Sequence, residues 1–226
     1  SDVWTGYVMS GQVTSLYTLS IPNYQLVVNM AGELVETSVD NGDGTFTYNV
    51  PVRQGYTWSD GSPITANDWQ FTFDTVKGLS LGGNFLSAYP YLCEADDGSS
   101  KNCVVSVVAT DDYTVSVTFN YDPGLSTWQY GTAQGPAFSK AYWESIATDK
   151  ESLYAHDAIN APVASAFVYD KLEQGAFYTW KYDANTMWYG GTTTIYDGGG
   201  TSFNWDNGKA PALSLIHISE PTRPSI

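Results

Sequence analysis

The sequence has few positive charges. Nine lysines and arginines stand against 24 aspartates and glutamates, which gives a formal net charge of −15. Nucleic acids and anionic lipid surfaces are bound mainly through cationic side chains, so this balance argues against both as partners. No apolar run reaches the ~18 residues of a membrane-spanning helix. Only two histidines are present, and one of them, His217, lies in the last ten residues.

Cysteine is equally scarce, with Cys93 and Cys103 as the only two. The polar segment 94–102 separates them, so both can lie at the mouth of one hairpin, where their Cβ atoms come close enough to bridge. Such a disulfide suits an extracytoplasmic protein. We predict a Cys93–Cys103 bridge, with two free thiols as the alternative.

Aromatic residues, in contrast, make up 15% of the chain, and apolar residues make up 42%, enough to build a core. Aromatic side chains favour strands, which predicts a β-rich fold. In segment 45–52 apolar and polar residues alternate as in a half-buried strand. Thr65 and Asp68 then form a capping box ahead of a predicted helix at 66–77, whose apolar residues are Trp69, Phe73 and Val76.

The remaining patterns are shorter. Pro22-Asn23 and an apolar stripe predict a helix over 24–36. The other predicted elements are a hairpin turn at 40–44, strands at 104–110 and 113–120, helical pieces near 125–130 and 139–146, and a hairpin of strands 167–172 and 177–182. Residues 190–208 are rich in turn residues and carry only a weak pattern.

Enzymatic and metal sites find little support. Segment 78–82 matches G-x-S-x-G, but a nucleophile elbow needs a strand before the serine, and here a predicted helix precedes it. One histidine outside the tail and two loop cysteines do not supply a zinc site. The Asp40/Asp43 and Asp96/Asp97 pairs lack the EF-hand spacing and are typical of turns. We therefore expect no catalytic residues, no metal and no cofactor.

Residues 44–76 carry a longer and more specific pattern. Strand 45–52 is followed by a run that resembles the family 5 solute-binding proteins of ABC importers, which bind peptides, dipeptides or nickel. The matching positions are Arg53, Gly55, Trp58, Asp60, Gly61, Pro63, Ile64, Thr65, Ala66 and Asp68. Segments 107–115 and 181–191 are similar to a hairpin and a turn of the same family. Two departures are Ala164–Phe167 in place of the family's Gly-Thr-Gly-Pro, and the lack of its Pro-x-Leu-Ala-x-Ser-Trp spacing after the first predicted helix.

The resemblance implies a mixed α/β, β-rich chain with a partial periplasmic-binding-protein class II fold. Residues 1–44 would begin the first lobe, 45–165 would form a small extra β-rich domain, and 166–212 would return into the truncated lobe. It also implies an extracytoplasmic, membrane-associated and monomeric protein that passes a peptide or similar solute to an ABC permease. The alternatives are an acidic adhesion or matrix module and, more weakly, a secreted hydrolase.

The same resemblance suggests where the solute binds. Segment 11–18 resembles the family's N-terminal ligand loop, so Tyr17 and Thr18 become candidates, and Trp128 and Gln134 occupy the other ligand-lining segment. Tyr17 and Trp128 can instead be core residues. Residues 213–223 look like a translated sequencing adapter, so we exclude 213–226 from the fold and expect the chain to be an N-terminal fragment.

Overall fold

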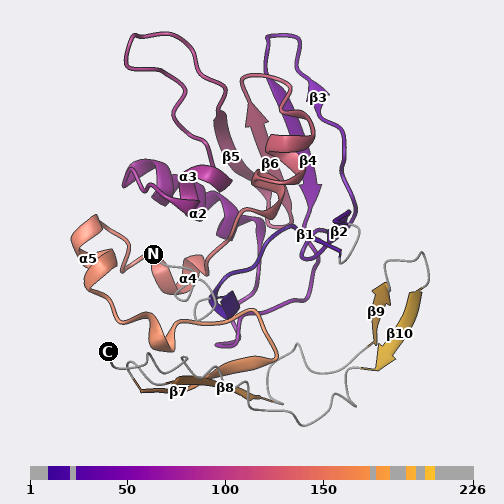
Figure 1. Cartoon of the computed structure of the whole chain (residues 1–226), viewed down its shortest axis with the longest axis vertical. Helices are drawn as coiled ribbons and strands as arrows, with labels where there is room; N and C mark the ends of the chain where they lie inside the picture. The colour runs from indigo at the N-terminus through magenta and orange to yellow at the C-terminus, as the bar shows by residue number, and fades with distance from the viewer. Residues whose placement is uncertain (1–9, 21–23, 174–176, 184–191, 197–201, 207–226) are drawn as a thin grey trace, which may run out of the picture.

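A computed structural model describes residues 10–20, 24–173, 177–183, 192–196 and 202–206 of the chain. The tail 213–226 and the Trp188–Gly191 part of the family-like turn lie outside these described residues. A four-stranded antiparallel sheet occupies the upper part of Figure 1, in the order β3-β4-β6-β5. Its strands are β3 (Val39–Asp40), β4 (Phe46–Pro51), β5 (Val104–Asp111) and β6 (Thr114–Phe119). The chain is thus mixed α/β and rich in strands, as predicted.

The alternation read from the sequence sets the two faces of this sheet. Tyr48 lies opposite Val117 in the β4–β6 register, and both side chains are buried on the inner face. On the outer face the hydroxyl groups of Thr47 and Thr118 are hydrogen-bonded across the same two strands at 2.9 Å. Because the side-chain period of a strand is two, one face packs and the other remains polar.

Helix α2 (Ala66–Gly78) covers the buried face, packed against β5 and β6. It begins where the capping box predicts, and the Thr65 N–H donates to the Asp68 carboxylate at 2.9 Å. The predicted apolar residues Trp69 and Phe73 are both buried. Local capping and burial of one helical face therefore agree on the placement of α2.

Strand β5 forms the edge of the sheet, where unpaired backbone groups would invite another strand. The Ala109 N–H on this edge donates to the side-chain oxygen of Gln70, on α2, at 2.9 Å. The exposed side chains of Val105 and Val108 also lie on β5. Gln70 thus occupies one backbone donor of the edge strand.

The predicted helix over 24–36 is wrong. The structure instead has β2 (Leu26–Val28), which pairs antiparallel with β1 (Tyr17–Leu19). Leu34, which the helical stripe required to be buried, is 43% exposed. Two consecutive valines, 27 and 28, favour extended backbone, and pairing with β1 outweighs the weak helical spacing.

The remaining elements are short, and Figure 1 shows α4 and α5 below α2. The predicted helical pieces form a π-helix, η2, and a single turn, α4. The predicted second hairpin is present as β7 and β8, which pair antiparallel. The full set is η1 (Ser10–Gln12), α3 (Asn84–Ala88), η2 (Leu125–Gln129), η3 (Thr132–Gln134), α4 (Lys140–Trp143), α5 (Lys150–Ala155), η4 (Ala158–Asn160), β7 (Phe167–Glu173) and β8 (Phe177–Tyr182).

The segment predicted to be rich in turns contains one further strand pair. Strands β9 (Thr192–Tyr196) and β10 (Ser202–Asp206) are antiparallel neighbours. Their β-branched and aromatic residues favour extended backbone, but each run is only five residues long and flanked by glycines. Such short runs gave no clear pattern in the sequence.

The disulfide between Cys93 and Cys103 is present, with a Cα–Cα distance of 5.1 Å. An isolated antiparallel bridge between Glu94 and Ser100 lies within the loop that it closes. The Cys103 N–H also donates to the side-chain oxygen of Asn120 at 2.9 Å, directly after β6. The bond therefore ties the 94–102 loop to the base of the β5–β6 hairpin.

Candidate binding site

The loop that precedes β1 lies beside the segment that follows η3. The Thr14 N–H donates to the Ala137 carbonyl at 3.1 Å, and the Ala137 N–H donates back to the Thr14 carbonyl at 2.7 Å. At the other end of the loop, the Ala164 N–H donates to the Gly11 carbonyl at 2.9 Å. The fold thus brings the predicted N-terminal ligand loop next to the segment that continues from Gln134.

Gln12 lies within this loop and was not singled out in the sequence. Its side chain is 3% exposed, and its amide nitrogen donates to the Ala158 carbonyl. Its Oε1 atom is buried without a hydrogen-bond partner among the described residues. A buried acceptor without a donor costs about 1–3 kcal/mol, so a ligand N–H placed here would be favoured. A single glutamine in a loop shows no periodic pattern in the sequence, so only its burial in the structure reveals Gln12 as a candidate.

Tyr17 is completely buried. Its hydroxyl donates to the Glu33 carbonyl at 2.9 Å and accepts the Val35 N–H at 3.0 Å. Burial raises the pKa of Tyr17 to about 12, although the Val35 hydrogen bond opposes that rise. Tyr17 therefore occupies the core position that was the alternative to a ligand contact, and it offers no surface to a solute in this structure.

Trp128 is also almost fully buried, at 2% exposure. Its ring stacks on Tyr48 with 3.8 Å between centroids and meets the edge of Tyr17 at 6.2 Å. Its indole N–H donates to the Val35 carbonyl at 3.0 Å. Tyr17 and Trp128 are thus brought together in the core.

The two polar candidates remain accessible. Thr18 is exposed on β1, and β1 packs against η3, which carries Gln134. The Gln134 side chain is half-buried, and its amide nitrogen donates to the Gln129 carbonyl at 2.8 Å. Thr18 and Gln134 are the accessible polar groups of this region, whereas the acceptor of Gln12 is buried.

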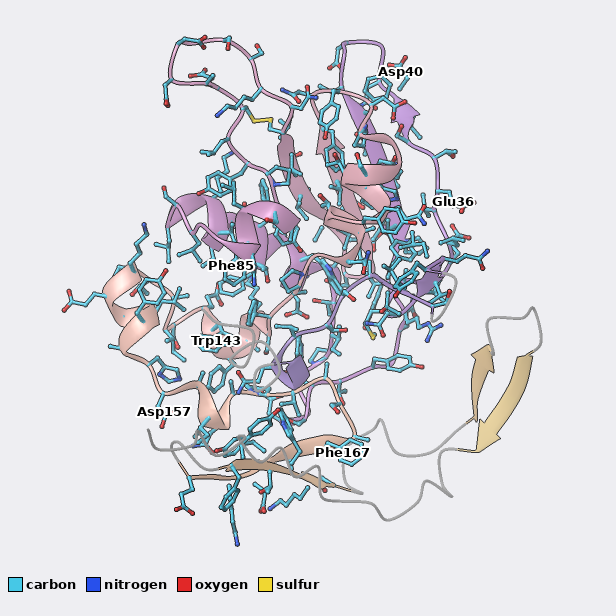
Figure 2. The ribbon with its side chains drawn as sticks, viewed as in Figure 1. Glu36, Asp40, Phe85, Trp143, Asp157 and Phe167 are labelled. Carbon is cyan, nitrogen blue, oxygen red and sulfur yellow. A yellow bond between two sulfur atoms is a disulfide. The ribbon has the colours of Figure 1, made fainter. Side chains whose placement is uncertain are left out.

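A separate cavity of about 400 Å³ lies between two connecting segments, residues 33–38, here called the strap, and residues 122–129. This volume is within the range of small-molecule sites. Figure 2 shows Glu36 of the strap at the right of the view, away from Trp143 and Asp157 at the lower left. The lining includes Glu36, Ser38, Tyr48, Asp122, Trp128 and Gln129.

Acid–base and metal chemistry find no assembled site in the described part of the chain. No group of three or more His, Cys, Asp and Glu side chains there is placed to hold a metal ion. Ser80 of the G-x-S-x-G match is an exposed residue that follows helix α2, without the strand that an elbow requires. The His156 Nε2 atom lies 2.9 Å from the Tyr142 hydroxyl, and its ring packs on Trp143.

The chain belongs to the bacterial extracellular solute-binding proteins, family 5. The model of the family's middle region matches residues 29–217. The family and the fold are those of substrate-binding proteins rather than enzymes, so the hydrolase alternative is wrong. No curated protein matches the chain.

Three solved structures illustrate the shared fold. OppA of Listeria monocytogenes bound to a peptide superposes with a TM-score of 0.58 at 18% identity, over 83% of this chain and 36% of that chain. DppA of Helicobacter pylori in complex with the peptide STSA gives 0.58 at 14% identity, over 83% and 36%. NikZ of Campylobacter jejuni in complex with Ni(L-His) gives 0.55 at 17% identity, over 78% and 31%.

The chain therefore spans about a third of the length of these structures. At such identities the likeness shows the fold, which is a partial periplasmic-binding-protein fold. Within the described residues, no helix is long and apolar enough to cross a membrane.

Proposed function

We propose that this chain is part of the solute-binding component of an ABC importer and that its solutes are peptides or similar small molecules. The observation that carries this proposal is the family match over residues 29–217. Two of the similar structures hold peptides, and one holds a nickel–histidine complex. With a solute bound, the solute-binding component would deliver that solute to the permease of the importer.

The rest of the proposal concerns the location, the oligomeric state and the domain division of the protein. The protein acts outside the cytoplasm, in the periplasm or at the cell surface, where the Cys93–Cys103 bond is stable. It works as a membrane-associated monomer and does not bind nucleic acid, in keeping with its charge of −15. Residues 1–44 and 166–212 belong to the first lobe, and 45–165 form the small extra domain.

We place the solute against the N-terminal loop rather than against Tyr17. The free acceptor of Gln12 suits an N–H donor of the kind that a peptide backbone carries, and Thr18 and Gln134 lie on neighbouring elements. Tyr17 and Trp128 support this surface from the core. A few fixed polar groups beside an apolar scaffold are typical of a small-molecule site.

The test is calorimetric titration with mixtures of two- to five-residue peptides, and separately with Ni(L-His). It is carried out on the 226-residue chain and on any longer product of its gene. We expect peptides to bind and Gln12→Met to weaken binding by about tenfold or more, because a buried acceptor is lost. Gln54→Met, at an exposed position, is the matched control.

Binding of the nickel complex alone would change the solute class. Absence of binding by every product of the gene, or equal affinity of Gln12→Met and the wild type, would contradict the proposed site. Circular dichroism of each variant shows that the comparison is made between folded proteins.

A further inference from the structure

The cavity between the strap and segment 122–129 is separate from the proposed solute surface. Neither the N-terminal loop nor Gln134 lines it. Tyr17 meets the edge of Trp128, but Tyr17 is not part of the lining either. A ligand of this cavity would therefore not compete for Gln12.

The lining combines an apolar floor with a negatively charged rim. Tyr48 and Trp128, stacked on each other, form the aromatic part of the floor. Glu36 of the strap and Asp122 of segment 122–129 each contribute an exposed carboxylate. Among the described residues, no lysine or arginine lines the cavity.

Neither carboxylate forms an ion pair with a cation among the residues that the structure describes. The ion pairs recorded in the described part of the chain join Lys140 to Glu144 and Lys181 to Asp170, on other elements. Burial raises the pKa of the Tyr48 hydroxyl; a hydrogen bond with Ser38 opposes the rise, and the charge of Asp122 adds to it. Asp122 lines the same cavity as Tyr48, so its charge lies near the cavity floor.

The walls are also fixed in position. The Trp128 indole N–H donates to the Val35 carbonyl, which joins segment 122–129 to the strap at 3.0 Å. Because Tyr17 holds the strap through Glu33 and Val35 as well, both sides of the cavity are anchored to the core. A preformed cavity loses little conformational entropy on binding.

We propose that this cavity binds a small organic cation, an alkylguanidinium or alkylammonium group carried on an apolar stem. The carboxylates of Glu36 and Asp122 face the charged head, and the floor of Tyr48 and Trp128 receives the stem. Cationic side chains combine a charged head with an apolar stem in this way, and aromatic rings attract cations besides. Anionic ligands would meet two like charges on a chain whose net charge is −15.

The experiment is a titration followed by NMR of the indole N–H resonances, with n-butylguanidinium as the probe and neutral n-butylurea as its isostere. We expect the Trp128 indole signal to shift with butylguanidinium and to shift far less with butylurea. Raising the salt from 0.15 to 1 M should weaken the binding several-fold, because the carboxylates are exposed and therefore screened.

Two carboxylate variants test the rim. Glu36→Gln and Asp122→Asn should each weaken binding by roughly two- to fivefold, and the double variant by about five- to twentyfold. The matched controls are Glu33→Gln, an exposed strap residue outside the lining, and Asp74→Asn on α2. Both controls should bind as the wild type does.

Peptides distinguish the two sources of the cation. If Ala-Arg-Ala shifts the Trp128 signal with the affinity of butylguanidinium or better, while Ala-citrulline-Ala leaves that signal unshifted, the cavity is assigned to side chains of peptides. If butylguanidinium shifts the Trp128 signal and Ala-Arg-Ala does not, the cavity is assigned to free cations. Equal shifts by butylurea, unchanged affinity of the double variant, or no shift of the Trp128 signal would each overturn the proposal.

Discussion

The carboxylate of Asp68 offers the sharpest test of how this fold is held together. Asp68 is 3% exposed and accepts three hydrogen bonds from three parts of the chain. The donors are the Thr65 N–H at 2.9 Å, the Lys140 N–H at 2.8 Å and the Trp58 indole N–H at 3.3 Å. One side chain thus fixes the start of α2, the start of α4 and a core indole.

Asp68→Ala removes the acceptor of all three hydrogen bonds at once. Leaving a buried donor unpaired costs about 1–3 kcal/mol, and breaking a buried charged network costs about 3–5 kcal/mol in total. Part of that loss is recovered because a desolvated carboxylate is removed as well. We therefore expect the free energy of unfolding to fall by about 3 kcal/mol, which lowers the Tm by roughly 6–12 °C for a chain of this size.

The pH dependence gives an independent check. Burial raises the pKa of Asp68 above its ordinary 3.8, although the hydrogen bonds from Lys140, Thr65 and Trp58 oppose the rise. The folded state then binds the proton more tightly than the unfolded state. The contribution of Asp68 is complete below its ordinary pKa and declines as the pH rises through the folded-state pKa. The stability of the wild type relative to that of Asp68→Asn should therefore be higher below pH 3.8 than at pH 7.

Urea denaturation followed by tryptophan fluorescence measures both effects. Asp74→Ala, at an exposed position of the same helix, is the control and should change stability by less than about 0.5 kcal/mol. If Asp68→Ala were as stable as this control, the three hydrogen bonds would contribute nothing net. A stability difference that grows with pH would show that hydrogen bonding, not burial, dominates the pKa of Asp68.

Three further substitutions, one of them with a matched control, test separate parts of the fold. Cys93→Ser opens a loop of ten residues and should cost about 3 kcal/mol by chain entropy, measured as the shift in urea midpoint. Gly135→Ala places a Cβ atom 2.8 Å from the Tyr89 ring and should cost about 1–3 kcal/mol in the same assay. Gly78→Ala is its control, because a Cβ atom at Gly78 has nothing within 4 Å. This control should be neutral or slightly stabilising. Tyr17→Phe leaves the part-buried Glu33 carbonyl and Val35 N–H without the hydroxyl and should lower the Tm by about 3–6 °C in calorimetry.

Each of these results can contradict its reasoning. A Cys93→Ser protein as stable as the wild type would mean that the native loop is strained by the bond. Equal effects of Gly135→Ala and Gly78→Ala would mean that Tyr89 moves freely. An unchanged Tm of Tyr17→Phe would mean that water replaces the hydroxyl at the strap.

Local chemistry allowed much of the sheet and its helix to be predicted. The alternation around Tyr48 and Val117, and the capping box of Thr65 and Asp68, act over a few residues, so their outcome is visible in the sequence. The Cys93–Cys103 bond belongs to the same class, because both residues flank a short polar loop. Family resemblance extended these local predictions to the correct fold.

Features that depend on distant partners were missed. Segment 24–36 has weak helical spacing, and only pairing with β1 decides that Leu26–Val28 is a strand. Tyr17 has the character of a ligand-facing aromatic, but contacts with Glu33, Val35 and Trp128 bury it. The acceptor of Gln12 and the cavity beside the strap depend on segments more than 90 residues apart, such as Val35 and Trp128.

The hydrogen bond from the Trp128 indole to the Val35 carbonyl also sets an order of events during synthesis. The two residues are 93 positions apart, so at about 5–20 residues per second Val35 is made roughly 5–20 seconds before its partner. Until then the backbone of the strap lacks the indole donor that secures it. Strand β4 waits in the same way for β6, its partner in the sheet. Nascent chains that end before Trp128 should therefore expose the strap and the inner face of β4 to proteases and chaperones.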